Sequence, residues 1–272
     1  MKVSMDCYTY QRRFREREWT VWDYLAHCER LRLDGAHLDR RHIGAEPDAA
    51  KHEYAKVRRF CDERGWEVVV AGGNRWFASQ ERESCLAEVT RDLRAAKLLG
   101  ARIVRVFLGG DVPRRRAAIE WSIRNLREAL VLAEEHDCVL AVEIPHKAID
   151  FPADGLEILE RLDSRHLGVT LDSGNLYANV DAHLPPVRAV ELLAPHIVAT
   201  HIRDYEYDPK ADKYHCVPCG EGLVDLPAIA GILKAHGYQG TLALEFLQLR
   251  SGEEGEERDR AIAASIEYLR SL

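Results

Sequence analysis

The sequence predicts an α/β protein, a (β/α)8 barrel or TIM barrel that forms a single domain over residues 1–272. Short runs rich in Val, Ile, Leu and Ala recur along the chain, and each is followed by a longer amphipathic stretch. This alternation is typical of parallel strands joined by crossover helices. Eight such runs share 272 residues, which gives 272/8 or 34 residues per unit. A barrel of about 250 residues has roughly 31 per unit, so the period supports the count.

The predicted strands are Lys2–Cys7, Gly35–Leu38, Glu67–Ala71, Arg102–Leu108, Cys138–Glu143, Leu167–Leu171, Ile197–His201 and Thr241–Phe246. Helices are predicted between them. From Asp92 onward, apolar residues follow a helical spacing that stops at Gly100, and Ala117–His136 and Leu226–His236 show the same pattern. A doubly wound open sheet usually has a Gly-rich turn after its first strand. Here Tyr8-Thr-Tyr-Gln-Arg-Arg follows instead, so the barrel is favoured.

Composition and charge indicate a globular protein and argue against partners such as nucleic acid or a membrane. With 46% hydrophobic and 31% charged residues, the chain has the composition of a soluble globular protein with a large core. The net charge of −7 comes from interspersed signs without a basic stripe, so nucleic acid is not expected as a partner. The sequence contains no apolar signal-type segment and no run near the ~20 apolar residues that span a bilayer. We therefore expect a cytoplasmic protein without a membrane partner.

The seven cysteines are an odd number spread over the chain, which indicates reduced thiols rather than a disulfide framework. Only Cys216 and Cys219 are closely spaced. Because this C-x-x-C has no second pair to complete a zinc site, we interpret the two as loop thiols.

Polar residues end the fifth to eighth predicted strands: Glu143, Asp172, His201 and Glu245. The carboxyl ends of barrel strands meet at one mouth, where the active sites of this fold lie. The separations 172 − 143 and 201 − 172 are both 29 residues, about one strand–helix unit. The last separation, 245 − 201, is 44 residues, because a long loop is predicted over Asp204–Gly222.

Each of these four residues alone has a simpler interpretation, as a helix cap or an ion-pair partner. Together, three carboxylates and one imidazole in a dry cleft cannot all stay ionised without a cation. This oxygen-rich set suits Mn²⁺, Mg²⁺ or Co²⁺, with Zn²⁺ as an alternative. The sequence therefore predicts a site for a divalent metal.

Several segments carry a family likeness: Ala141-Val-Glu-Ile-Pro-His, Val169-Thr-Leu-Asp-Ser-Gly-Asn, Thr200-His-Ile-Arg-Asp, Val217-Pro-Cys-Gly-Glu-Gly-Leu-Val-Asp-Leu and Gly237-Tyr-Gln-Gly-Thr-Leu-Ala-Leu-Glu. Through them the chain resembles the sugar isomerase/epimerase superfamily of xylose-isomerase-like barrels. That superfamily includes ketose 3-epimerases, hydroxypyruvate isomerases and inosose dehydratases. The resemblance covers most of the chain and implies a small carbohydrate substrate.

The resemblance also implies that the four strand-end residues hold the metal, and that Glu143 and Glu245 are catalytic and pass protons. A metal bound by a substrate carbonyl and hydroxyl would stabilise an enediolate. Return of the proton to the opposite face is epimerisation, and return to a neighbouring atom is isomerisation. If the enediolate loses a hydroxyl or arises by loss of CO₂, the same site is a dehydratase or decarboxylase of a keto-sugar or sugar acid. This lyase alternative stays open.

One position departs from the family. Many members have His three residues after the metal-binding Asp, where this chain has Asn175. Asn donates a hydrogen bond but cannot act as an acid near pH 7, so the substrate can differ from that of the epimerases. We predict that Asn175 contacts the substrate.

Five further side chains are predicted to contact the substrate: Tyr8, His37, His146, Arg203 and His215. Tyr8 and His37 end the first two strands, and His146 follows Glu143 by three residues. Arg203 could meet an anionic group, with a surface ion pair as the other interpretation. His215 lies in the predicted long loop, which is tyrosine-rich and suits either a lid or a subunit contact in a homo-oligomer.

The remaining motifs have two interpretations each. Asp204 either orients the ligand histidine or caps a loop or helix. Trp76 and Phe77 either form a wall against a sugar or pack in the core. Nothing resembles a Gly-rich phosphate loop, and Gly220-Glu-Gly places a carboxylate where phosphate would be repelled, which favours a nonphosphorylated substrate.

Two other classes of function compete with these. Metal-dependent phosphodiester cleavage occurs in endonuclease IV, which shares this barrel, but it requires more metal-binding histidines and a basic groove than this chain offers. A noncatalytic barrel that serves as an assembly subunit is motivated by the tyrosine-rich loop alone.

Overall fold

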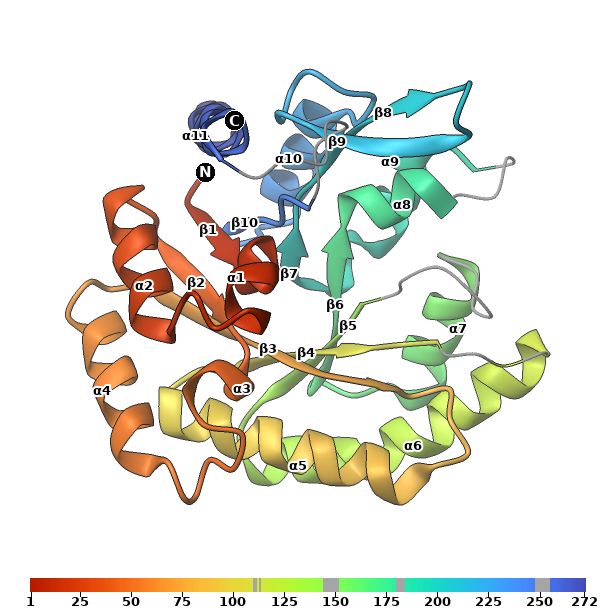
Figure 1. Ribbon diagram of the computed structural model, residues 1–272. Coiled ribbons are helices and arrows are strands. Elements are labelled where there is room, and N and C mark those ends of the chain that lie inside the picture. The colour runs from red at the N-terminus through yellow and green to blue at the C-terminus, as the bar shows by residue number, and fades with distance from the viewer. Residues whose placement is uncertain (110–111, 113, 144–151, 180–183, 248–254) are drawn as a thin grey trace.

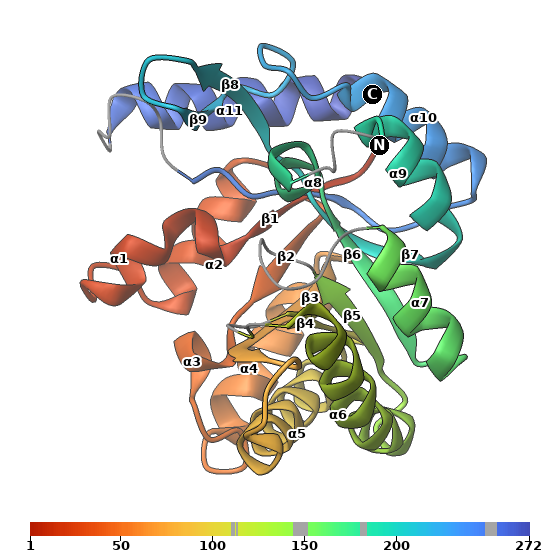
Figure 2. The same cartoon turned by 90° about the vertical axis from the view of Figure 1, so that its right-hand side faces the viewer.

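The computed structural model covers residues 1–272 and describes all except 110–111, 113, 144–151, 180–183 and 248–254; for 73–76 and 178–179 it describes only the backbone. Eight parallel strands form one sheet in the order β10-β1-β2-β3-β4-β5-β6-β7. Helices lie outside the strands and cover them, as Figures 1 and 2 show from two directions. The predicted (β/α)8 barrel is confirmed.

The barrel strands are β1 (Val3–Asp6), β2 (Gly35–Leu38), β3 (Glu67–Trp76), β4 (Ile103–Phe107), β5 (Val139–Glu143), β6 (Leu167–Asp172), β7 (Ile197–His201) and β10 (Leu242–Leu244). The α-helices are α1 (Gln11–Arg15), α2 (Val21–Arg30), α3 (Arg40–Ile43), α4 (Lys51–Asp62), α5 (Arg82–Leu99), α6 (Arg115–Glu135), α7 (Ala153–Leu162), α8 (Ser173–Asn179), α9 (Pro186–Leu193), α10 (Leu226–Ala235) and α11 (Glu256–Ser271). Two short 3-10 helices are η1 (Cys7–Tyr10) and η2 (Ala194–His196). Among the described helices, none is long and apolar enough to cross a membrane.

The sheet nearly closes between β7 and β10. Beyond the end of β7, Ile202 forms a parallel bridge with Leu244. The Ile202 N–H donates to the Ala243 carbonyl over 2.7 Å, and the Glu245 N–H donates to the Ile202 carbonyl over 3.1 Å. These bonds bring the residues that follow β7 and β10 side by side, which positions both His201 and Glu245.

Local sequence explains where α5 ends. Gly100 has φ +72°, a left-handed conformation that glycine adopts without steric cost, and its N–H bonds to Lys97 in the last turn. The chain can therefore turn at once into β4, as the sequence predicted.

The third strand runs further than predicted. The sequence placed its end at Ala71, before two glycines, but β3 continues to Trp76, which pairs with Phe107 after a register shift. Tertiary pairing with β4 thus overrides the low strand propensity of glycine. The neighbouring Phe77 is fully buried, in agreement with the core interpretation for that residue.

The prediction of a long loop over Asp204–Gly222 is wrong in part, because this segment contains a β-hairpin. Strands β8 (Asp204–Asp208) and β9 (Lys213–Val217) pair antiparallel outside the barrel, next to α8 (Figure 1). Tyr207 and Tyr214 face each other across the hairpin with ring centroids 5.1 Å apart. Aromatic cross-strand pairs of this kind stabilise a ladder that a count of residues alone does not reveal.

Burial is most complete in the barrel strands. Every residue of β1, β2 and β6 is buried, as expected for parallel strands that are covered by helices on one side and fill the barrel on the other. Among these buried residues are the polar side chains of Asp6, His37 and Asp172. Buried polar groups require partners, and theirs lie at the carboxyl ends of the strands.

Candidate metal centre

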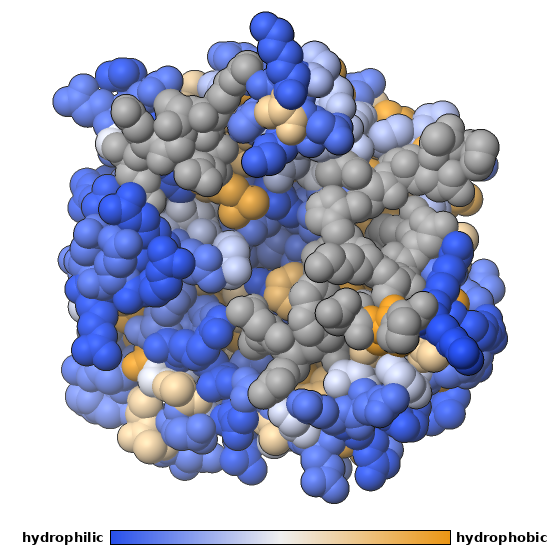
Figure 3. All heavy atoms as spheres, turned by 45° about the vertical axis from the view of Figure 1, so that its right-hand side comes forward, coloured by the Kyte–Doolittle hydropathy of each residue, from blue (hydrophilic) through white to orange (hydrophobic). Residues whose placement is uncertain are grey.

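Four strand ends bring Glu143, Asp172, His201 and Glu245 together. The first three end β5, β6 and β7, and Glu245 directly follows β10. Each offers one ligand atom, and these atoms all lie within 4.8 Å of one another. The residues are only 3%, 5%, 1% and 7% exposed. On the face drawn in Figure 3, the molecule is hollowed near its centre, and the visible floor of the hollow is mostly hydrophilic.

The two ring nitrogens of His201 face different groups. Nδ1 lies 3.3 Å from Glu143 Oε2 and 3.6 Å from Glu245 Oε2. Nε2 lies 2.9 Å from Asp6 Oδ2 and 3.1 Å from His37 Nδ1. Within the described part of the chain, Nδ1 and the two glutamate oxygens that face it make no hydrogen bond. Because buried polar atoms are costly without partners, these donors fit a cation bound between them.

Asp172 is held by Asn175 and Arg203. The backbone N–H of Asn175 donates to Asp172 Oδ1, and its side-chain amide donates to Oδ2, both over 2.9 Å. The same amide lies 3.5 Å from Glu143 Oε1. Asn175 therefore bridges two of the candidate ligands, and its contact with substrate stays a prediction.

Arg203 is 7% exposed, so the alternative interpretation of a surface ion pair is wrong. Its Nε donates to Asp172 Oδ1 over 3.0 Å, its Nη2 contacts Oδ2, and its Nε lies 3.5 Å from Glu245 Oε2. Arg203 is held inside the protein because two hydrogen bonds join the segment after β6 to the segment after β7. Ser173 Oγ donates to the Arg203 carbonyl and accepts from the Arg203 N–H, both over 2.8 Å. These two bonds hold Arg203 beside Asp172.

Sequence reasoning missed two residues of this site. Asp6 ends β1, is fully buried and contacts His201. Arg105 lies within β4, is 3% exposed, and its Nε is 3.3 Å from Glu143 Oε2. Asp6 carried the same signal as the predicted ligands, a polar residue at the end of an apolar run. Arg105 carried none, because a charge inside a strand is usually solvent-facing.

The two glutamates differ in their electrostatic surroundings. Burial raises the pKa of Glu245 to about 7, despite the nearby charges of Arg203 and His201. Burial acts in the same direction on Glu143, but His201 and Arg105 outweigh it and lower the pKa of Glu143 to about 2. Burial also raises the pKa of Asp172. In the metal-free protein, the two candidate proton carriers thus favour different protonation states.

The other predicted substrate contacts are placed as follows. His37 is the second-to-last residue of β2 and is 1% exposed. Its side chain faces His201 and Asp6. Tyr8 does not end β1, because the strand stops at Asp6; it lies half-buried in η1. His215 lies on β9 opposite Glu206 and is not part of the four-residue cluster. His146 falls outside the described residues. For all four, contact with substrate stays a prediction.

The C-x-x-C cysteines are not both loop residues. Cys216 belongs to β9 and Cys219 follows it, and both are buried thiols that form no disulfide. Burial raises the pKa of Cys219 to about 12, so it is protonated near neutral pH and poorly suited to bind metal.

Asp204 organises the segment that follows the hairpin, and does not contact His201 among its described bonds. Its Oδ2 accepts from the N–H groups of Gly220 and Gly222, both over 2.9 Å. Its Oδ1 accepts from Tyr205 and Val224 over 2.9 and 3.0 Å. A Cβ at position 222 would lie 2.2 Å from Asp204 Oδ1, so only glycine allows this approach. The loop-cap interpretation of Asp204 is therefore the one that the structure supports.

Asp204→Ala should lower the free energy of unfolding by about 2–3 kcal/mol, because backbone donors that now bind a buried carboxylate would lose their acceptor. Urea denaturation measures this change. Asp225→Ala is the matched control: Asp225 caps α10 through one bond to Ala228 at an exposed site, and its loss should cost about 1 kcal/mol. Equal effects of the two variants would contradict the account.

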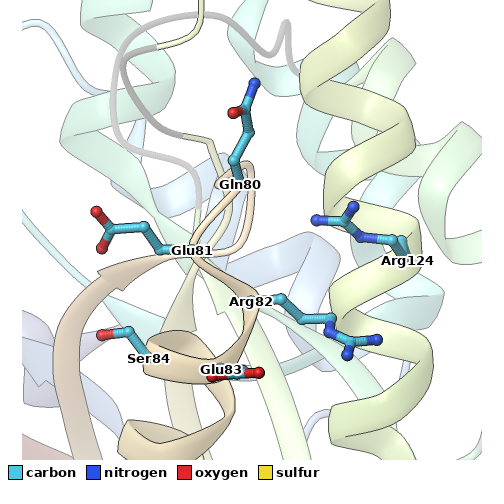
Figure 4. Close-up of a pocket in the computed structure, with 6 residues that line it drawn as sticks. All are labelled: Gln80, Glu81, Arg82, Glu83, Ser84 and Arg124. Carbon is cyan, nitrogen blue, oxygen red and sulfur yellow. The ribbon is translucent and has the colours of Figure 1, made fainter.

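A second hollow lies away from this cluster, at the start of α5 and beside α6. Its lining residues are Gln80, Glu81, Arg82, Glu83, Ser84 and Arg124. Their side chains point in different directions and do not converge on one point (Figure 4). Arg82 is engaged by Glu128 over 2.6 Å and Arg124 by the Ser79 carbonyl over 3.3 Å. This hollow offers no comparable donor set.

A family model described as the xylose isomerase-like TIM barrel matches residues 28–272. The chain belongs to this family. The resemblance stated from the motifs is thereby confirmed. In this xylose isomerase-like protein, the candidate metal centre lies at the mouth of the barrel.

Solved structures similar to this xylose isomerase-like chain share its fold. They include 3-keto-D-glucoside 4-epimerase from E. coli (TM-score 0.74, 17% identity, all of both chains covered). D-psicose 3-epimerase in the presence of D-fructose has a TM-score of 0.77 at 14% identity, covering 100% of this chain and 99% of that one. The IOLI protein with a bound zinc atom has a TM-score of 0.77 at 17% identity, covering 99% and 96%.

One curated relative is 3-oxo-isoapionate decarboxylase of Pectobacterium atrosepticum, which is 26% identical over 145 residues. The match covers 52% of this chain and 50% of the relative, so it spans about half the length of either protein.

Proposed function

We propose that this protein is a divalent-metal-dependent isomerase or epimerase of a small nonphosphorylated sugar or keto-sugar. The observation that carries the proposal is the buried cluster of four ligand atoms within 4.8 Å, three of which lack a hydrogen bond among the described residues. Three carboxylates and one imidazole form a donor set for Mn²⁺, Mg²⁺ or Co²⁺, with Zn²⁺ as an alternative.

The charge of the site supports a divalent cation. When all four carboxylates are ionised, as metal ligation requires, they face two buried guanidinium groups and leave an excess of two negative charges: Asp6, Glu143, Asp172 and Glu245 against Arg105 and Arg203. Burial acts to lower the pKa of His201, but the charges of Glu143 and Asp6 outweigh it and raise the pKa well above its ordinary value. His201 would lose this proton on binding a metal and then add nothing to the balance. Uncompensated charge in a dry interior is costly, and one divalent ion would offset it.

Glu143 and Glu245 are the proposed proton carriers. When bound, the metal would polarise a substrate carbonyl and make the adjacent carbon more acidic. Glu143 and Glu245 reach the cluster from β5 and β10, which are separated by β6 and β7 in the nearly closed barrel. Each could therefore exchange a proton with a different face of a bound sugar. Asn175 and Arg105 would keep Glu143 in place through contacts of 3.5 and 3.3 Å.

The proposal specifies a substrate without phosphate. The backbone N–H groups of Gly220 and Gly222, which resemble a nest for an anion, already bind the Asp204 carboxylate. They are thus satisfied inside the protein. This supports a sugar or keto-sugar whose hydroxyl and carbonyl oxygens are its only polar groups.

A lyase that acts on a keto-sugar acid is the second candidate. The partial likeness to 3-oxo-isoapionate decarboxylase favours it, as does the placement of Arg203 and Arg105 beside the cluster. An arginine next to the reacting carbon could bind the carboxylate of such a substrate. The same enediolate would then form by loss of CO₂ rather than by removal of a proton.

To test the two candidates, metal-loaded protein is incubated in D₂O with a panel of ketoses, keto-sugars and sugar acids, followed by NMR and mass spectrometry. An isomerase or epimerase should incorporate deuterium at the reacting carbon while the carbon skeleton is conserved. Loss of CO₂ or water from a sugar acid would assign the lyase instead. A panel without exchange or mass change, with metal bound, would contradict both.

A further inference from the structure

Asp6 is a buried carboxylate whose two oxygens have separate contacts. Oδ1 accepts from the backbone N–H of Tyr8 over 2.6 Å, which caps η1. Oδ2 lies 2.9 Å from His201 Nε2 and 3.7 Å from His37 Nδ1. Asp6 and His201 are 0% and 1% exposed, so water does not compete for these contacts.

The direction of the Asp6–His201 contact follows from the chemistry of the two groups. Asp6 Oδ2 and His201 Nε2 form an ion-pair contact of 2.9 Å, whereas the hydrogen bond of Nε2 runs to His37 Nδ1 over 3.1 Å. Because an ionised carboxylate repels a nitrogen lone pair and attracts an N–H, the contact with Asp6 favours a proton on Nε2. A neutral imidazole has one protonated nitrogen, and its lone pair is then on Nδ1. Nδ1 is the atom that faces Glu143 and Glu245.

We propose that Asp6 is a positioning residue, which holds His201 in the Nε2-protonated form with its Nδ1 lone pair directed into the metal cluster. This inference rests on the proposed metal-dependent function. A carboxylate that accepts from a metal-binding histidine fixes the orientation of the ring and makes it a stronger ligand. With Nε2 of His201 protonated, the Nδ1 lone pair of His37, 3.1 Å away, would accept from the same N–H.

The Asp6→Asn variant separates this role from a structural one. Because Oδ1 of residue 6 must keep accepting from the Tyr8 N–H, the new amide nitrogen would take the place of Oδ2 beside His201. A donor would then face the Nε2 proton. The imidazole would have to move its proton to Nδ1, and the lone pair needed for the metal would be lost. In serine proteases, the corresponding Asp-to-Asn change selects the wrong tautomer with a large loss of rate.

The experiment is a Co²⁺ titration of metal-free wild-type and Asp6→Asn protein, followed by visible absorption and calorimetry. We expect the variant to bind Co²⁺ about 10- to 100-fold more weakly, with an altered ligand-field spectrum. Asp154→Asn is the matched control, since Asp154 is a buried carboxylate on the outer helix α7 that pairs with Arg115. It should bind Co²⁺ as the wild type does.

Long-range ¹H–¹⁵N NMR of the zinc-loaded wild type reads the tautomer without any substitution, so the test does not depend on the variant folding. A proton on His201 Nε2 is expected, and a proton on Nδ1 would overturn the inference. Equal affinity and spectra for wild type and Asp6→Asn would overturn it as well. No saturable Co²⁺ binding by the wild type would instead contradict the proposed metal-dependent function.

Discussion

Removal of the divalent metal should reduce turnover of the proton-exchange substrate to below about 1% of its rate, and the metal should restore it. Chelated protein should also melt at a lower temperature. Binding at 100 times the dissociation constant stabilises a folded protein by about 2.7 kcal/mol. For a chain of this size, that corresponds to a shift in melting temperature of roughly 5–10 °C.

Two variants make the metal experiment specific. In Asp172→Asn, one charged candidate ligand is lost and the guanidinium of Arg203 loses its nearest carboxylate partner, so the metal-dependent melting shift should shrink or vanish. In Glu267→Gln, an exposed carboxylate on α11 is changed and the shift should be that of the wild type. Full turnover by chelated protein, or an equal shift in both variants, would argue against the metal site.

Replacement of Glu245 by glutamine should lower kcat by about 10²- to 10⁴-fold, the range expected when a general acid–base group is lost. Glutamine retains an oxygen that can face the metal, so the effect should persist at saturating metal. Deuterium exchange with each of two epimeric sugars, measured at saturating metal, provides the test.

Glu143→Gln is the partner of this experiment. If the two glutamates serve opposite faces of the substrate, each variant should retain exchange of the reacting hydrogen in one epimer only, and the two variants should retain opposite epimers. Loss of exchange from the same epimer in both variants would exclude the two-face mechanism. Undiminished exchange with both epimers in Glu245→Gln would remove Glu245 from the catalytic role.

The order of the elements could be predicted because it depends on local patterns. Apolar runs of strand length, amphipathic stretches and a stop such as Gly100 are set by nearest neighbours along the chain. The positions of the candidate ligands followed from the same patterns, since Glu143 and His201 each end an apolar run. The barrel topology then makes strand ends meet.

The ends of the strands were predicted less accurately than their order, and for this reason Asp6 was not predicted as a site residue. The apolar Cys7 extended the predicted first strand past Asp6, so Tyr8 seemed to be the residue at the mouth. The strand in fact ends at Asp6, whose Oδ1 caps η1. A shift of one residue thus decides which side chain of β1 reaches the site.

The sequence by itself determined the eight-unit barrel and the four residues gathered at its mouth, because alternation and strand ends are local properties. Only the tertiary structure decided how these residues are partnered. His37 and His201 meet although 164 residues separate them, and Arg105 and Arg203 turn inward rather than toward solvent. Such contacts depend on closure of the sheet between β7 and β10, which brings distant strands within a few ångströms. No pattern of neighbouring residues encodes those distances.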